Sequence, residues 1–525
     1  MAYLCNCAVS VRLRPGLPVN RQRAGPIESV FFKFKSDEEN GGAMAQRLWI
    51  AFSALLLSAG AASAQDAKTV LQTAQKAMGD VTSIQYSGTG HLNSFGQAYT
   101  PGGAWPATNL TSYAKTIDYS SKSAKEEITH SEPNPPVKGG GRPFAGDEKL
   151  VYFVSGQFAW DQPSGTPVPQ PGAAGERQLQ IWLTPHGFLK AAMENNATAK
   201  KGAAGTVVSF ETGKFKVEGT INAQNMVTKT DTWLPNPVLG DMPVETTFSG
   251  YKDFSGVKFP TTIVQKQGGS PVLELTVSSM KVNPGLSLSV PDGVKTASVP
   301  SIRVQSQKLG DGIWFVGGGS HNSMVVEFPS YITVIEGPLG EARSLAVIAE
   351  AKRLVPNKPL KYLINTHSHF DHAGGVRTYV AEGATVVTQE INVPFYQKVW
   401  AAPRTLNPDE LAKSSTEANF IGVREKYVLS EGDRTLEIYH ESGSMHHPGM
   451  LIVYFPRDKI LEEADDYTPD TPQVPAPSGV RPPLLMANLL KQIQALKLDV
   501  ATVAPMHGPV VPYSDMEKAA SSGKG

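Results

Sequence analysis

One short segment constrains this chain more than any other. Residues Asn365–Gly375 read NTHSHFDHAGG and place three histidines and one aspartate within six positions. Histidine is scarce in the chain, with 11 in 525 residues, so a chance cluster in a polar surface loop explains the segment poorly. Imidazole and carboxylate groups together suit zinc or a similar first-row divalent ion. The segment therefore predicts a metal site.

The flanking residues predict that this cluster lies between a strand and a helix. Residues Leu360–Ile364 form a mostly apolar run, which is typical of a buried strand. The pattern of residues 373–383 predicts a short helix that ends near Gly383. Loops between a strand and a helix are the usual place for sites in α/β folds.

The spacing inside the loop predicts two neighbouring points of binding. Residues two apart in an extended loop point the same way, so His367 and His369 can converge on one ion. Asp371 and His372 follow where the helix begins, and we expect them to face an adjacent point.

The order H-S-H-F-D-H resembles the H-x-H-x-D-H signature of the metallo-β-lactamase superfamily, whose fold has four αββα layers. The family requires three further ligands in order, and the chain supplies all three: His446 in SMHHPG, Asp465 in EEADDY and His507 in APMHGP. The similarity extends over roughly Ile302 to Tyr513. One departure is Ala464, which stands where the family usually has glycine.

This resemblance implies a centre of two zinc ions. The first ion would be bound by His367, His369 and His446. The second ion would be bound by Asp371, His372 and His507. Asp465 would bridge both ions, and Asp371 and Asp465 are the expected catalytic carboxylates. Such ions lie ~3.5–4 Å apart and hold a hydroxide, because a metal-bound water loses its proton near pH ~7.

Other polar residues near these motifs have weaker assignments. His447 adjoins His446, but the following Pro-Gly favours His446 as the ligand. We expect His440 and His321 to be strand or loop histidines, with a substrate contact left open for His321. Glu336 stands where the family often carries an aspartate that supports the site, so the outer hydrogen bonds of the centre are left open.

The whole chain is predicted to divide into four parts. Residues 1–43 look like a spurious or disordered extension, and residues 44–64 look like a secretory signal peptide. A β-rich α+β domain is expected over 65–298, and the four-layer α/β domain over 299–525. All seven expected ligands lie beyond Ser301, so a fragment that begins there is predicted to fold and bind zinc alone.

The signal peptide predicts a periplasmic or secreted protein. Its apolar run, Leu48–Ala59, is shorter than the ~20 residues that a membrane span needs. The small residues Ala62–Ala64 predict cleavage before Gln65. The two cysteines of the chain fall in the first 43 residues, so the mature protein would have neither a disulfide nor a cysteine ligand.

The N-terminal domain is predicted to be one helix against a curved antiparallel sheet. Residues 67–80 have an amphipathic pattern, and 215–221 alternate as a strand does. Gly268-Gly269 predicts a hairpin. Residues 250–264 weakly resemble the periplasmic lipoprotein-carrier half-barrels, which implies an acyl or lipid ligand; a structural or docking module is the alternative.

Four aromatic residues lie on an insert of the metal domain: Phe395, Tyr396, Trp400 and Phe420. They would either line an apolar substrate pocket or pack the insert onto the core.

Two classes of function fit the whole sequence. The first is a zinc hydrolase of a small-molecule ester, lactone or thioester, with β-lactam hydrolysis as the alternative, because zinc β-lactamases usually carry cysteine or serine in place of Asp465. The second is a lipid- or partner-binding protein with a vestigial metal site. The zero net charge and the lack of a notable basic tract disfavour nucleic acid as a partner, and none is expected.

Overall fold

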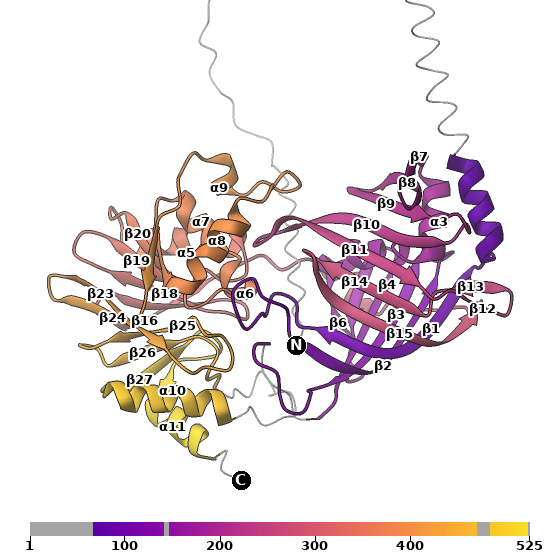
Figure 1. The fold of residues 1–525 in the computed structure, drawn as a ribbon. Helices are drawn as coiled ribbons and strands as arrows, with labels where there is room; N and C mark the ends of the chain where they lie inside the picture. The colour runs from indigo at the N-terminus through magenta and orange to yellow at the C-terminus, as the bar shows by residue number, and fades with distance from the viewer. Residues whose placement is uncertain (1–66, 141–145, 470–482, 523–525) are drawn as a thin grey trace, which may run out of the picture.

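The computed structural model describes residues 67–140, 146–469 and 483–522. The expected extension, the signal peptide and the Gln65 cleavage point lie outside these residues. Two sheet-containing domains follow one another along the chain (Figure 1). Within the described residues, the longest apolar helix is too short to cross a bilayer.

The N-terminal domain is built on one antiparallel sheet of 13 strands, in the order β6-β5-β4-β3-β2-β1-β15-β14-β11-β10-β9-β8-β7. Its strands are β1 (Ser83–Asn93), β2 (Ala107–Asp118), β3 (Ser123–Ser131), β4 (Glu148–Ser155), β5 (Phe158–Asp161), β6 (Val168–Pro169), β7 (Thr198–Gly202), β8 (Gly205–Thr212), β9 (Phe215–Ile221), β10 (Val227–Asn236), β11 (Gly240–Ser249), β14 (Thr262–Gln267) and β15 (Ser270–Val282). A separate hairpin pairs β12 (Lys252–Phe254) with β13 (Val257–Phe259).

The predicted hairpin at Gly268-Gly269 is confirmed. It joins β14 to β15, and Gln267 pairs with Ser270 across the turn. Both glycines have positive φ, +57° and +88°, as a two-residue type I′ turn requires.

Among the described residues, three helices of two turns or more, rather than the predicted one, pack against this sheet, and the single turn of α4 (Asp292–Lys295) contacts β5 and β6. The first covers residues 67–78, and the other two are α2 (Ala174–Trp182) and α3 (Pro185–Glu194). α2 begins at the end of a proline- and glycine-rich run, residues 163–176. Pro185 stands in the first turn of α3, a position where proline favours helix initiation. All three helices contribute to one apolar core with the sheet.

The C-terminal domain contains two sheets. The first has the order β16 (Gln305–Gly310), β17 (Ile313–Gly317), β18 (Ser323–Glu327), β19 (Ile332–Ile335), β20 (Leu360–Ile364), β21 (Thr385–Gln389) and β22 (Phe420–Val423). The second has the order β23 (Lys426–Glu431), β24 (Arg434–Glu441), β25 (Met450–Phe455), β26 (Ile460–Glu463), β27 (Thr502–Pro505) and β28 (Val511–Pro512). The strands from β19 to β22 are parallel, and the expected strand at 360–364 is confirmed.

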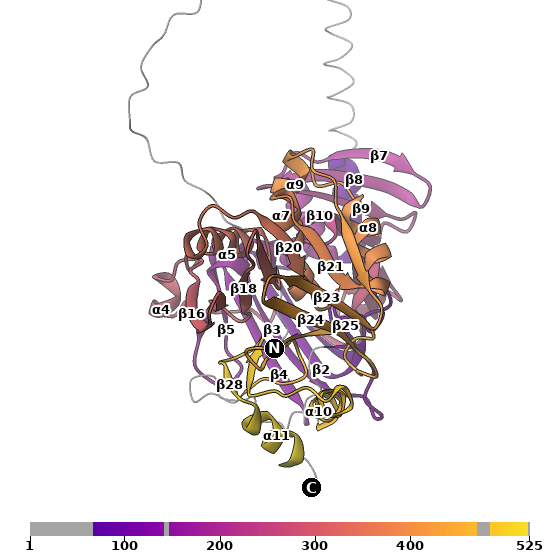
Figure 2. The same ribbon diagram turned by 90° about the vertical axis from the view of Figure 1, so that its left-hand side faces the viewer.

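Helices cover both outer faces, which gives four layers (Figure 1 and Figure 2). On the first sheet lie α5 (Glu341–Leu354) and α7 (Val376–Ala381), and on the second lie α10 (Pro483–Leu496) and α11 (Tyr513–Ser522). An apolar core fills the space between the two sheets, and two more join each sheet to its helices. The predicted αββα architecture is therefore confirmed.

The insert after β21 packs against the N-terminal domain. Its aromatic side chains lie on and after α8 (Val393–Trp400), and Phe395 and Tyr396 are buried against Val238 of the other domain. The Tyr396 hydroxyl donates to Asn365 at the start of the histidine loop. These contacts favour the packing alternative for the insert.

One arginine strengthens this junction. The guanidinium of Arg404, 6 % exposed, donates to the backbone carbonyls of residues 236–238 at distances of 2.7–3.2 Å. The Asp241 carboxylate in turn accepts from Thr405 and Leu406. The domains are therefore joined by polar as well as apolar contacts close to the histidine loop.

Candidate metal centre

The histidine loop lies between β20 and α6 (Phe370–Ala373). His367, His369 and His372 are buried, although each carries a polar ring. Burial of unpaired polar rings is costly, so this arrangement needs a compensating interaction. The other candidate residues come from loops at the ends of β17, β24, β26 and β27, which meet at the same edge of the two sheets.

A first group of candidate ligands combines three histidines with one carboxylate. The ligand atoms of this group lie within 4.8 Å of one another and belong to His367, His369, His446 and Asp465. His446 Nε2 is 3.2 Å from His367 Nε2. The three histidines predicted for the first ion thus lie together, and Asp465 lies with them.

A second group of three histidines lies beside the first: His321, His372 and His507. His372 and His507 were predicted for the second ion, whereas His321 was not. The third predicted residue, Asp371, lies at the side of this group. Its Oδ2 is 3.4 Å from His321 Nε2 and 4.0 Å from His372 Nε2.

Asp465 contacts both groups. Its Oδ2 lies 2.8 Å from His446 Nε2 and 3.1 Å from His372 Nε2. Its Oδ1 lies 2.8 Å from His507 Nε2. This position between the two groups is the one that a bridging carboxylate would need.

Hydrogen bonds on the far side of the rings orient several of these histidines. His372 Nδ1 faces the Glu336 carboxylate at 3.3 Å, and His507 Nδ1 donates to Ser320 O at 3.0 Å. His369 Nε2 donates to Ala98 O at 2.9 Å. Because a carbonyl or carboxylate accepts, the bonded nitrogen carries the proton and the opposite nitrogen has a free lone pair. Outer partners of this kind are typical of metal-bound histidines.

Glu336 has the supporting position that the sequence left open. Its Oε1 accepts from Thr366 N at 2.6 Å, while Oε2 faces His372. Both side chains are fully buried. The longer glutamate therefore reaches the same loop that an aspartate would support, and the backbone of Glu336 adopts a φ of +68° there.

His447 and His440 make hydrogen bonds outside the two groups. His447 Nδ1 accepts from Gly449 N at 2.9 Å, so its Nε2 is the donor to Ser368 Oγ at 3.0 Å. His440 Nε2 donates to Pro448 O at 2.8 Å. Of the adjacent pair, His446 therefore faces the centre, in the register that the Pro-Gly sequence favours.

The protonation of the centre suits a cation. Burial and the neighbouring His372 lower the pKa of His367 to about 4, and burial with His446 lowers the pKa of His369 well below its usual value. Burial opposes ionisation of Asp465, but His372 and His446 hold its pKa well below the usual range. Neutral imidazole and ionised carboxylate are the forms that bind metals.

His372 differs from the other histidines. Burial alone would lower its pKa, but the carboxylates of Asp465 and Asp371 outweigh burial and raise it well above the usual value. A proton on His372 would compete with a divalent ion for the same nitrogen.

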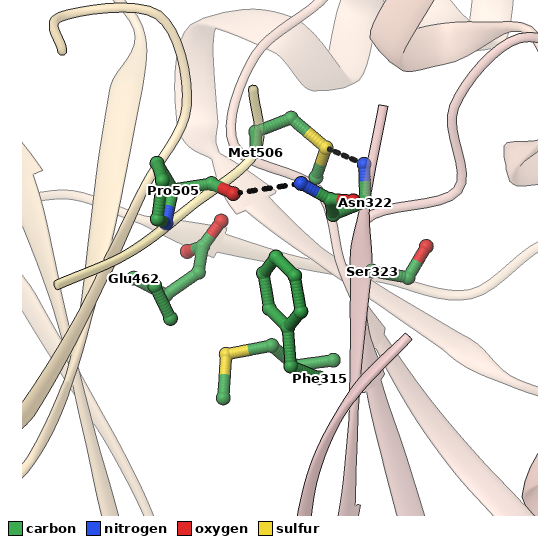
Figure 3. A pocket seen from close by; sticks show the side chains of 8 residues that line it. Phe315, Asn322, Ser323, Glu462, Pro505 and Met506 are labelled. Atoms are coloured by element: carbon green, nitrogen blue, oxygen red, sulfur yellow. Dashed lines mark hydrogen bonds between the residues drawn. The ribbon is translucent and has the colours of Figure 1, made fainter. Parts of the chain in front are cut away.

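His321 is the candidate ligand that sequence reasoning missed. It lies at the end of the loop between β17 and β18, and its pKa is lowered to about 4 by burial and by His507. The adjacent Asn322 ties this loop to the one that carries His507, since its Nδ2 donates to Pro505 O at 3.1 Å (Figure 3). Its backbone N also donates to Met506 O at 2.8 Å. The sequence signal that could have indicated His321 is its position after Gly317–Gly319 and just before a buried strand.

The described residues fit a metal. Three buried ring nitrogens have no hydrogen-bond partner among the described residues: His369 Nδ1, His321 Nε2 and His372 Nε2. The last two lie near carboxylate oxygens of Asp371 and Asp465. Unpaired buried nitrogens are costly, and coordination of a divalent ion would satisfy them. The two groups of side chains are therefore suited to hold a divalent metal.

Comparison with known proteins finds similarity over this domain. Residues 316–507 match the sequence model of the Metallo-beta-lactamase superfamily. The chain is also similar to a linear primary-alkylsulfatase from Pseudomonas sp. (strain ATCC 19151), with 23% identity over 235 residues. That match covers 37% of this chain and 42% of the relative, less than half of the relative's length. The half-barrel resemblance of the N-terminal domain is not confirmed.

Solved structures also match about two-fifths of this chain. A metallo-beta-lactamase from Pontibacter korlensis matches with a TM-score of 0.32 and 19% identity, covering 42% of this chain and 98% of that one. The rubredoxin oxygen:oxidoreductase of Desulfovibrio gigas matches with a TM-score of 0.33 and 18% identity, covering 42% and 60%. Matches this distant carry no argument about activity.

Proposed function

We propose that this protein, whose C-terminal domain has the metallo-β-lactamase fold, is a binuclear zinc hydrolase of a small-molecule carboxylic ester, lactone or thioester. The observation that carries the proposal is the pair of histidine groups joined through Asp465. Histidine-rich sets with few carboxylates suit zinc. A binding protein with a vestigial site would have no need to keep so many outer hydrogen bonds on its histidines.

Each ion has a defined set of residues. The first would be held by His367, His369 and His446. The second would be held by His372 and His507, together with Asp371 and His321 beside them. Asp465 would contact both. When bound, the ions supply Lewis acidity and lower the pKa of a coordinated water to ~7, which provides a nucleophile at neutral pH.

The side chains of this protein hold that chemistry in place. Asp465 keeps the two histidine groups at a fixed separation, because its Oδ2 lies against His446 of the first group and His372 of the second, while its Oδ1 lies against His507. Burial raises the pKa of Asp371, but the neighbouring His372 and the contact with His321 outweigh burial. The pKa of Asp371 is therefore held well below its usual range. Asp371 is therefore an ionised carboxylate, the form that binds a divalent ion. Most of the histidines of the two groups are buried, and burial strengthens the charge interactions among these side chains.

Sulfate esters are the second candidate substrate class. The observation that favours them is the similarity to an enzyme described as a linear primary-alkylsulfatase. β-Lactams rank behind both classes, because an aspartate at 465 replaces the cysteine or serine usual in zinc β-lactamases.

A metal analysis combined with a substrate panel tests the proposal. The purified protein should retain close to two equivalents of zinc. Zinc-loaded protein is assayed with p-nitrophenyl esters, a lactone, a thioester, a long-chain alkyl sulfate and a chromogenic cephalosporin. We expect turnover of a carboxylic ester, lactone or thioester that chelation abolishes and zinc restores. His446→Ala should lose this turnover, whereas His440→Ala, on the adjacent strand, should keep it.

Two results would overturn the proposal. Protein without bound metal and without turnover on any substrate would favour the binding-protein alternative. Turnover that resists both chelation and His446→Ala would place the chemistry elsewhere.

We also propose that the protein is exported. The support is the signal-like pattern of residues 44–64. Protein recovered from the periplasm or medium should begin at Gln65, and N-terminal sequencing that finds Met44 retained would contradict export with cleavage.

A further inference from the structure

The loop between β1 and β2 of the N-terminal domain lies against the histidine loop. This segment, residues 94–106, reaches α6 at the junction of the domains (Figure 1). Phe370 N donates to Gly96 O at 3.2 Å. The Phe370 ring packs edge-on against Phe95 and Trp105, with centroid distances of 5.4 and 6.1 Å.

Two polar contacts go from this loop directly to candidate ligands. Gln97 Nε2 donates to Asp371 Oδ1 at 2.8 Å, and Ala98 O accepts from His369 Nε2 at 2.9 Å. The first contact leaves Asp371 Oδ2 directed at the second histidine group. The second leaves His369 Nδ1 directed at the first group. Each group therefore has one ligand oriented by the other domain.

The backbone around Gln97 is itself held in place. Gly140 N donates to Gln97 O at 2.9 Å, and the neighbouring Gly139 N donates to Met445 O at 2.8 Å. Met445 directly precedes His446, so the same part of the N-terminal domain contacts both ligand-bearing loops. A Cβ atom on Gly139 would come within 2.7 Å of Tyr99 N. The loop thus has little freedom to move independently of the centre.

We propose that Gln97 is a positioning residue of the metal centre, and that the N-terminal domain completes the site rather than serving only as a docking module. Gln97 acts through Asp371: its amide holds one carboxylate oxygen so that the other points at the second ion. This inference rests on the proposed binuclear centre. Outer hydrogen bonds of this kind typically change metal affinity by 10–100-fold when removed.

A titration of the metal-free full-length protein with Co²⁺ or Zn²⁺ against a chelator of known affinity tests this. Gln97→Met keeps the length of the side chain and removes its donor. We expect the weaker of two binding steps to lose ~10–100-fold in affinity, while the tighter step stays unchanged. The visible spectrum of the second Co²⁺ should also change, which a purely structural role of Gln97 would not cause.

Gln85 provides a matched control. It lies on β1, is also half-buried, and donates to Thr116 within its own domain at 2.9 Å. Gln85→Met should leave both binding steps as in the wild type.

A second pair of variants tests the loop as a whole. A Cβ atom on Gly96 would lie 2.5 Å from Phe370 Cγ, so Gly96→Ala must shift the loop from the centre. Gly156 has a similar positive φ, with no atom within 4 Å of an added Cβ. Gly156→Ala imposes a comparable backbone strain without the clash. We expect Gly96→Ala to weaken both binding steps and Gly156→Ala to weaken neither.

The outcomes separate this inference from the proposed function. If the wild type binds two ions, and Gln97→Met and Gly96→Ala bind both with the same affinities and spectra, the inference is wrong and the proposed centre remains. If the wild type binds no divalent ion, the proposed function itself fails.

Discussion

Replacement of Asp465 by asparagine removes one charge from the point where the two histidine groups meet. The carboxamide has nearly the same shape, so the packing around this residue should persist. One oxygen of Asp465 lies 2.8 Å from His446 Nε2, and the other lies 2.8 Å from His507 Nε2. The substitution therefore tests the charge and the bridging role together.

The size of the effect follows from the distances. A unit charge pair ~4 Å apart, at an effective dielectric constant of ~20, is worth ~4 kcal/mol. That free energy corresponds to ~10³ in a binding constant, since ~1.4 kcal/mol is tenfold. The amide oxygen keeps part of the interaction, so we expect a loss of ~10²-fold or more for the second ion. The first ion keeps its three histidines and should remain bound.

Metal titration and steady-state kinetics on the same preparation measure this prediction. Turnover should fall by ~10²-fold or more, because the proposed nucleophile depends on both ions. The loss of turnover should exceed the loss of total bound metal.

Asp466→Asn is the control, one residue along the chain. Asp466 is buried and belongs to neither histidine group, and burial together with Glu441 raises the pKa of its carboxyl well above the usual value. Asparagine keeps the shape of this side chain and leaves the residues of both groups unchanged. If Asp466→Asn abolished turnover while Asp465→Asn kept both ions and full turnover, the assignment of the bridge would be wrong.

Three further substitutions test Glu336 beside the histidine groups and two charged residues near the domain junction, Arg404 and Asp409. Glu336→Gln should weaken the second binding step by ~10–100-fold, because the neutral amide orients His372 less strongly; metal titration measures this. Arg404→Ala should lower the thermal midpoint by an amount equivalent to about 2–3 kcal/mol, since it leaves buried carbonyls unpaired; calorimetry that shows no change would refute this. Burial opposes ionisation of Asp409, but Arg377 holds its pKa below 3.8. The stability that the Asp409 carboxylate contributes is therefore present above pH ~4 and lost as the pH falls through the folded pKa. The thermal midpoints of wild type and Asp409→Asn should converge as the pH falls below ~4.

The histidine loop was predictable because its geometry is local. A buried strand, a short loop and a helix start lie within 25 residues of sequence, and the backbone sets which side chains share a direction. The apolar run of β20 and the hairpin glycines at 268 and 269 were likewise readable from residue type alone. The order of motifs after the loop then placed His446, Asp465 and His507 through resemblance to a family.

The helices of the N-terminal domain were less predictable. α2 follows directly after a proline- and glycine-rich run that reads as a loop, and it is short. Its stability comes from burial of one face against the large sheet, as is usual for helices of this length.

The sequence by itself predicted the histidine loop through local spacing, and it predicted the order of the later candidate ligands and the four-layer fold through resemblance to a family. Only the tertiary structure brought His321 to the second group and Glu336 to His372. It also brought Gln97, 274 residues away in sequence, to the Asp371 carboxylate. Such contacts depend on how two separately patterned domains dock. Docking is set by the shape and polarity of whole surfaces, and no periodicity or spacing along the chain encodes which residues of those surfaces will meet.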